Sequence, residues 1–131
     1  MTEQAPELAN PHVDLGVAYA RVGDLPQAAA SLERAVAVSA SHPIALNELA
    51  LVYRKQGRFA DARASYERAL ALYPEFHAAN KNLAILCDLY QRDYGCALRH
   101  YEAYRAAVPD DAQAAIWIAD LEGRAPSGVP R

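Results

Sequence analysis

Few residues of this 131-residue chain are of types that could do chemistry, and their spacing does not favour catalysis. No histidine has a second metal ligand at a helical spacing such as His-x3-His. The glycine-rich phosphate-binding motifs and the nucleophile motif Gly-x-Ser-x-Gly do not occur in the sequence. We therefore expect no enzyme activity, no metal site and no cofactor. The isolated surface or helix-end histidines are His12, His42, His77 and His100.

Two pairs of reactive side chains need a closer look. Asp110 and Asp111 could act as acid and base in a buried site, but they stand where a helix is expected to begin, and negative charge is favourable there. Cys87 and Cys96 are nine residues apart and match neither Cys-x-x-Cys nor a zinc-finger spacing. We interpret them as reduced thiols. Because they are expected on two successive helices, a bridge between them is geometrically conceivable.

The composition is that of a folded, soluble chain within the size of one domain. Hydrophobic residues make up 53% and charged residues 22%. A formal net charge of -3 provides no basic field for nucleic-acid binding. No apolar stretch is long enough to span a membrane, and the first residues do not resemble a signal peptide. We expect a cytoplasmic protein, or a periplasmic one if a leader has been removed; two lysines against eleven arginines suggest a GC-rich bacterial source.

The chain repeats itself with a period of about 34 residues. The same size classes recur at equal offsets in a first and a second copy: Leu15-Gly16, Tyr19, Gly23, Ala28, Leu32 and Ala35, then Leu49-Ala50, Tyr53, Gly57, Ala62, Tyr66 and Ala69. A third copy begins with Leu83-Ala84 and Cys87. Its second half, with Ala97, Tyr101 and Tyr104, follows at an offset of 35, so one residue is inserted between Cys87 and Arg92.

Residues 9–110 resemble the tetratricopeptide repeat (TPR) family, whose repeat reads Trp-x2-Leu-Gly-x2-Tyr, then Ala-x3-Phe, then Pro. The Trp place holds His12, Leu46 and Asn80, and a usually small place holds Tyr104. The resemblance implies an all-α fold: a right-handed α-solenoid of about seven helices in antiparallel pairs. Small residues such as Gly16 mark close helix contacts, and large residues such as Leu15 and Tyr19 fill the buried faces. Because Arg92 replaces the glycine of the third turn, we expect that turn to take another shape.

The predicted organisation follows the repeat. We expect a flexible N-terminus at 1–8, repeats at 9–42, 43–76 and 77–111, a capping helix at 112–123 and a flexible tail at 124–131. The helices are predicted near 10–22, 27–40, 44–56, 60–72, 77–91 and 95–107. The cap carries an apolar stripe that includes Trp117 and Leu121.

The resemblance also implies a binding surface, because the first helices of TPR repeats line a concave groove that holds a peptide or helix of another protein. Carried over by position, the groove residues are Val13, Val17, Asn47, Leu51, Arg54, Lys81, Ile85 and Asp88, together with Ala20. The polar residues of this set are expected to be exposed. Val17, Leu51 and Ile85 could instead be part of the core.

One TPR specificity can be tested from the sequence. Chaperone-binding TPR domains hold a C-terminal carboxylate with Lys and Asn of repeat one, Asn of repeat two, and Lys and Arg of repeat three. The corresponding residues here are Val13, Val17, Glu48, Ala78 and Asn82, so this clamp is missing. We expect a protein or peptide partner of another kind, without nucleic acid or membrane insertion. The alternative is a self-associating structural unit; a monomer is expected, and a solution mass would separate the two.

Overall fold

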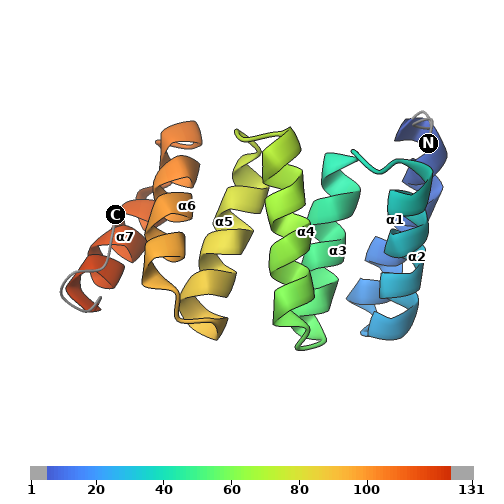
Figure 1. Ribbon diagram of the computed structural model, residues 1–131, viewed down its shortest axis with the longest axis horizontal. Coiled ribbons are helices and arrows are strands. Elements are labelled where there is room, and N and C mark those ends of the chain that lie inside the picture. Colours follow the sequence, from blue (N-terminus) through green and yellow to red (C-terminus); the bar gives the residue numbers. More distant parts are fainter. Residues whose placement is uncertain (1–5, 125–131) are drawn as a thin grey trace. The chain divides into compact units, whose positions relative to one another are not determined.

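The computed structural model describes residues 6–124, and this part of the chain contains seven α-helices, one π-helical segment and no strand (Figure 1). The all-α prediction is confirmed. The helices fall into two compact units, of which the first ends at Pro74 and the second begins at Glu75. No helix among the described residues has the length and hydropathy that a membrane span requires.

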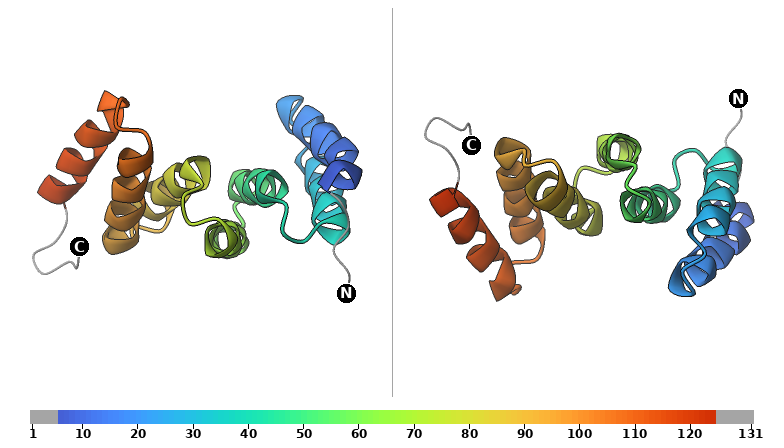
Figure 2. Two further views of the ribbon diagram at one scale, coloured as in Figure 1. Left: turned by 90° about the horizontal axis from the view of Figure 1, so that it is seen from above. Right: turned by 90° about the horizontal axis from the view of Figure 1, so that it is seen from below.

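The first unit contains α1 (Pro6–Arg21), α2 (Leu25–Val38), α3 (Pro43–Lys55) and α4 (Phe59–Leu72). They form two helix hairpins, α1 with α2 and α3 with α4, and α3 also contacts α2 and α1 (Figure 2). The predicted helix bounds are close to those observed, except at the N-terminus. The helix already begins at Pro6, so the prediction of a flexible segment is wrong for residues 6–8, and residues 1–5 lie outside the described part. A proline is well accommodated at the first helical position.

Local signals end and begin these helices where the sequence places them. Gly23 and Gly57 have φ values of 85° and 79°, in the left-handed region that glycine adopts at low cost after a helix. The Asp24 carboxylate accepts the Gln27 backbone N–H at 3.2 Å and caps α2. His42 is a helix-end residue, as predicted: its Nδ1 accepts the Ala45 N–H at 3.2 Å, and its Nε2 lies 2.9 Å from Asn10 Oδ1.

Small residues let the helices of each hairpin approach closely. Ala28, Ala50 and Ala62 are completely buried, as predicted for contact positions. The contact is tightest in the first hairpin, where a Cβ added to Gly16 would lie 2.5 Å from Leu32 Cγ. Leu32 therefore packs directly against the α1 backbone, and its side chain is completely buried.

Leu15 does not occupy the buried position that the repeat predicts. It is 45% exposed, whereas Leu49, at the same place in the second repeat, is 5% exposed. The difference has a physical cause: α2 packs against α3, while α1 contacts α2 and α3 on its other sides and no helix among the described residues precedes it. A repeat position buries its side chain only where a preceding helix covers it.

The second unit contains α5 (His77–Ile85), the π-helical segment η1 (Leu86–Tyr90), α6 (Tyr94–Ala107) and α7 (Ala112–Arg124). The inserted residue is accommodated in η1, where the Gln91 N–H donates to the Leu86 carbonyl, five residues back, at 3.0 Å. Arg92 then adopts a φ of 53°, in the same region as the glycines of the first two turns. The turn keeps the left-handed position, but its hydrogen bonds differ as expected: the Asp93 N–H donates to the Cys87 carbonyl six residues back, whereas the Asp24 and Arg58 N–H groups donate five residues back.

Helix α7 is the predicted cap. Ala114, Ile118 and Leu121 are buried, and α7 contacts α6. Asp111 precedes it and accepts the Gln113 N–H at 3.0 Å, so this carboxylate has the capping role expected of the acidic pair. The hydrogen bond from the Tyr104 hydroxyl is the main cause that holds the pKa of Asp111 below its usual value. Of the predicted flexible tail, Arg124 is helical and residues 125–131 lie outside the described part.

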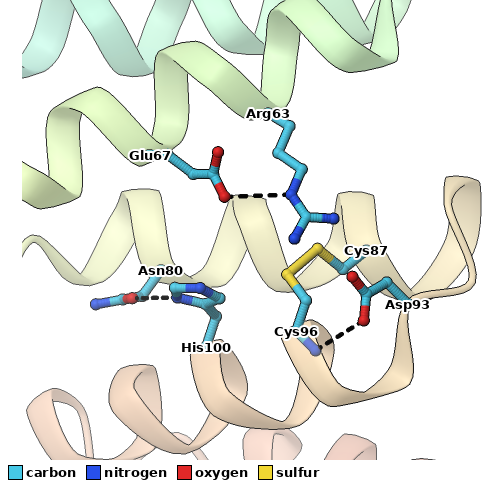
Figure 3. Close-up of a disulfide and its surroundings, with 7 residues drawn as sticks. All are labelled: Arg63, Glu67, Asn80, Cys87, Asp93, Cys96 and His100. Carbon is cyan, nitrogen blue, oxygen red and sulfur yellow. Dashed lines mark hydrogen bonds and ion pairs between the residues drawn. A yellow bond between two sulfur atoms is a disulfide. The ribbon is translucent and has the colours of Figure 1, made fainter.

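The two cysteines form a disulfide, which corrects our interpretation of them as reduced thiols (Figure 3). Cys87 lies in η1 and Cys96 in the first turn of α6, with their Cα atoms 5.9 Å apart. The Asp93 carboxylate accepts the Cys96 N–H at 3.1 Å and fixes the start of α6. Both cysteines are completely buried. The pairing depends on how η1 packs on α6, which the spacing of nine residues does not reveal.

The close contact at Gly16 predicts that two glycine substitutions affect the free energy of unfolding differently. We expect Gly16→Ala to lower the free energy of unfolding by roughly 1–3 kcal/mol, because the added methyl collides with Leu32. Gly123→Ala, in a helix where an added Cβ meets no atom within 4 Å, should leave stability unchanged or raise it by up to about 0.5–1 kcal/mol. Urea denaturation measures both. Equal effects for the two variants would contradict this packing.

The disulfide should stabilise the fold by constraining the unfolded chain. For a loop of this length, removing it through Cys87→Ala with Cys96→Ala, or by reduction, should lower the free energy of unfolding by about 2–3 kcal/mol. Urea denaturation with and without a reducing agent gives the measurement. The double variant is the control, because the reducing agent should have no effect on it. An equal response of the wild type and the variant would show that the bridge is not formed.

Candidate peptide-binding surface

The first unit presents some of the predicted groove residues and buries the others. Val17 on α1 and Leu51 and Arg54 on α3 are partly exposed, as is Ala20. Val13 and Asn47 are buried, so the expectation that Asn47 would be exposed is wrong. The partly exposed residues belong to two helices that contact each other, α1 and α3.

Charged groups surround Leu51 on this face. Glu48, one turn before Leu51 on α3, is partly buried, and burial raises its pKa, while the charges of Lys55 and Arg21 lower it. Arg21 is the last residue of α1, so charges from both helices act on the same carboxylate. The result is an apolar side chain among groups of both signs.

A buried hydroxyl lies beneath the same face. Tyr66 on α4 is completely buried, and among the described residues its hydroxyl has no hydrogen-bond partner. Burial raises its pKa, and the charges of Arg54 and Glu48 also act on it, with opposite signs.

In the second unit, aromatic rings hold Lys81 in place. Its Nζ lies 5.5 Å from the Tyr104 ring centroid and 5.3 Å from the Trp117 ring centroid, close enough for a cation–π interaction with each. Ile85, one turn further on α5, is partly exposed. Asp88 is buried and accepts a hydrogen bond from the Tyr101 hydroxyl at 3.3 Å, so our expectation of an exposed Asp88 is wrong.

Sequence reasoning missed the partners of Lys81. Tyr104 occupies a repeat position that is usually small, and its hydroxyl donates a hydrogen bond to Asp111 just before α7. Trp117 from α7 lies against Tyr101, with ring centroids 5.5 Å apart. One indication of this contact is present in the sequence, namely that Tyr104 departs from the repeat pattern. The cap therefore brings an aromatic ring to a surface that the repeats alone would not complete.

Most tyrosines at repeat positions belong to the core. Tyr53, Tyr66, Tyr101 and Tyr104 are buried, whereas Tyr19 is only partly so. Tyr73 and Tyr90, which the repeat does not place in the core, are exposed, and Tyr94 is intermediate.

The first unit also has a hollow between α2 and α4, with α3 as its floor. It has a volume of about 310 Å³ and includes Glu33, Leu46 and Arg68 in its lining. The Tyr53 hydroxyl donates to the Glu33 carboxylate at 2.6 Å, and the Arg58 guanidinium lies 4.1 Å from the Tyr53 ring centroid. Burial, followed by this hydrogen bond, raises the pKa of Tyr53 to about 12. The bond joins α2 to α3 at the edge of their interface.

The described residues contain no group of three or more His, Cys, Asp or Glu side chains that could hold a metal ion. Two histidines have structural hydrogen bonds, since His42 caps α3 and a His100 ring nitrogen lies 2.9 Å from Asn80 Oδ1 (Figure 3). What remains is a set of partly exposed apolar and charged side chains suited to noncovalent recognition.

Comparisons with known proteins agree with the helical repeat fold. The sequence model described as "Tetratricopeptide repeat" matches residues 13–75 and again 48–87. No curated protein matches the sequence. Several solved structures have the same fold at low identity.

Three solved structures illustrate the similarity. The first TPR of Spaghetti (RPAP3) bound to the HSP90 peptide SRMEEVD is 18% identical, with a TM-score of 0.81 over 88% of this chain and 93% of that one. The second TPR domain of human RPAP3, in complex with the HSP70 peptide SGPTIEEVD, is 17% identical, with a TM-score of 0.80 over 90% and 98%. The Sgt2 TPR domain from Aspergillus fumigatus is 19% identical, with a TM-score of 0.82 over 93% and 81%. Identities of this size establish the fold alone.

Proposed function

Because the chain belongs to the tetratricopeptide repeat family, we propose that it binds a polypeptide segment of a partner protein on the first helices of its repeats. The observation that carries the proposal is the partial exposure of Leu51 on α3, between Glu48 and Arg54. An apolar side chain with charges of both signs beside it can bind a partner's apolar residue and orient the polar groups next to it.

The second unit supports the same function through a different chemistry. Lys81 is held against two aromatic rings, and Ile85 is partly exposed on the same helix. A side chain that is already ordered loses less conformational entropy when a partner binds. Lys81 can therefore offer an oriented positive charge beside the Trp117 ring.

The partner differs in kind from the acidic peptides bound to the two RPAP3 domains, which end in Glu-Glu-Val-Asp. Where the chaperone clamp has asparagine in repeat two, this chain has Glu48, whose carboxylate repels a terminal carboxylate. Val13 and Ala78 stand where the clamp has lysines and supply no charge. We propose a segment recognised by its apolar residues and internal polar groups, without a chaperone-type terminus.

Leu51→Glu should abolish partner binding while leaving the fold intact. A second carboxylate would stand one turn from Glu48 and replace the apolar contact, but Leu51 is not completely buried, so the melting temperature should change little. Random peptides displayed on phage can be selected against the wild type and then measured against each variant by fluorescence anisotropy.

Leu72→Glu is the matched control, because Leu72 is exposed and lies at the end of α4. It should bind the selected peptides as the wild type does. Selected peptides that bind Leu51→Glu equally well, or a selection without any enriched sequence, would count against the proposal. Unfolding of Leu51→Glu would show that Leu51 belongs to the core.

We also propose that the protein works in an oxidising compartment, in place of the cytoplasmic location expected from the sequence. The support is the completely buried Cys87–Cys96 disulfide, since such bonds persist where thiols are not kept reduced. Protein isolated from its natural source without a reducing agent should show no free thiols after denaturation. Two free thiols per chain would exclude this compartment.

A further inference from the structure

The outer side of α1 carries an apolar stripe that no described element covers. Leu8 is 54% exposed, Leu15 45% and Val22, in the turn after the helix, 78%. Pro11 and Ala18 lie between them and are also exposed. The spacing of these five residues is alternately three and four, which places them on one side of the helix. A narrow stripe with this spacing is suited to packing against another helix.

The second repeat shows what covers the same positions there. Leu49 and Tyr53 on α3 correspond to Leu15 and Tyr19 on α1, and both are buried where α2 packs on α3. At this interface the Tyr53 hydroxyl donates to Glu33 of α2 at 2.6 Å. The α1 stripe is therefore the counterpart of a surface that, in this same chain, binds an amphipathic helix with a carboxylate at a fixed place.

Tyr19 retains the polar group that such a helix would need. It is partly exposed, and among the described residues its hydroxyl makes no hydrogen bond. Its hydroxyl can donate to a carboxylate, as the Tyr53 hydroxyl does to Glu33. The chemistry of this end of α1 matches a carboxylate on the incoming helix.

We propose that the outer side of α1 is a second docking surface, which binds an amphipathic helix of a partner protein that places an Asp or Glu opposite Tyr19. This surface is distinct from the one around Leu51. The partner helix presents small and aliphatic residues to Leu8, Leu15 and Val22.

A second copy of the chain does not offer a free helix of the α2 type. The three helices of the α2 type have their central residues buried: Leu32 in α2, Tyr66 in α4 and Tyr101 in α6. The Glu33 carboxylate is bound to Tyr53, and Glu67 pairs with Arg63 at 3.2 Å. A second copy could provide this face only by opening its own helix pairs, so we assign the surface to a different protein.

The test uses the full chain and a helix-stapled, fluorescent peptide with the sequence of residues 24–39, which contains α2 and its cap. Fluorescence anisotropy should show saturable binding to the wild type. Leu15→Glu should raise the Kd at least tenfold. Leu72→Glu is the matched control, because Leu72 is also 45% exposed, and it should leave the Kd unchanged.

A double-mutant cycle tests the predicted hydrogen bond. Tyr19→Phe in the protein and Glu33→Gln in the peptide should each raise the Kd about threefold to tenfold, and together no more than either alone. Circular dichroism checks that each variant is folded. If the effects of the two substitutions on the Kd add, the two side chains do not interact, and the Tyr19 contact is no longer part of the proposal.

Three results would overturn the proposal as a whole. The first is no saturable binding of the peptide up to millimolar concentration. The second is binding that Leu15→Glu leaves unchanged, which would mean that the peptide displaces the chain's own α2. The third is a dimer, seen by sedimentation, that Leu15→Glu dissociates, because a second copy would then be the occupant.

Discussion

Close approach of helix backbones is the constraint on which the rest of this structure depends. Gly16 leaves no room between α1 and the Leu32 side chain, and the buried alanines of the other hairpins have the same place in the pattern. Helices separated by such small residues gain dispersion contacts along their whole length. The positions of the large residues then follow, because each must fill the space beside a small one.

Where this packing ends, surfaces become available. Leu49 is covered by α2, but Leu15, at the same repeat position, is covered by no helix of the described part of the chain and stays exposed. At the other end of the chain, α7 covers the apolar face of α6 and adds Trp117 beside Lys81. Residues of one repeat pattern thus lie in the core, in an exposed stripe or at an aromatic surface, depending on the helix that packs against them.

The third repeat shows how the fold tolerates an irregular sequence. Its extra residue is contained in the π-helical turn of η1, and Arg92 then takes the left-handed conformation that glycine has in the other copies. The Cys87–Cys96 bridge joins this turn to α6. A covalent bond next to an irregular helix end offsets part of the flexibility that such an end would have.

The sequence by itself determined the repeat period, the helices and their caps, the small residues at the contacts and the missing chaperone clamp. These features depend on residue types at fixed offsets, so they can be read without knowing which surfaces meet. The tertiary structure decided the rest. Asn47 and Asp88 are buried, Leu15 is exposed, Lys81 lies between two rings, and two cysteines nine residues apart are bonded. Each of these facts depends on the helix that packs against the residue. A repeat pattern gives every copy the same environment, although among the described residues α7 packs on α6 and no helix covers the outer side of α1.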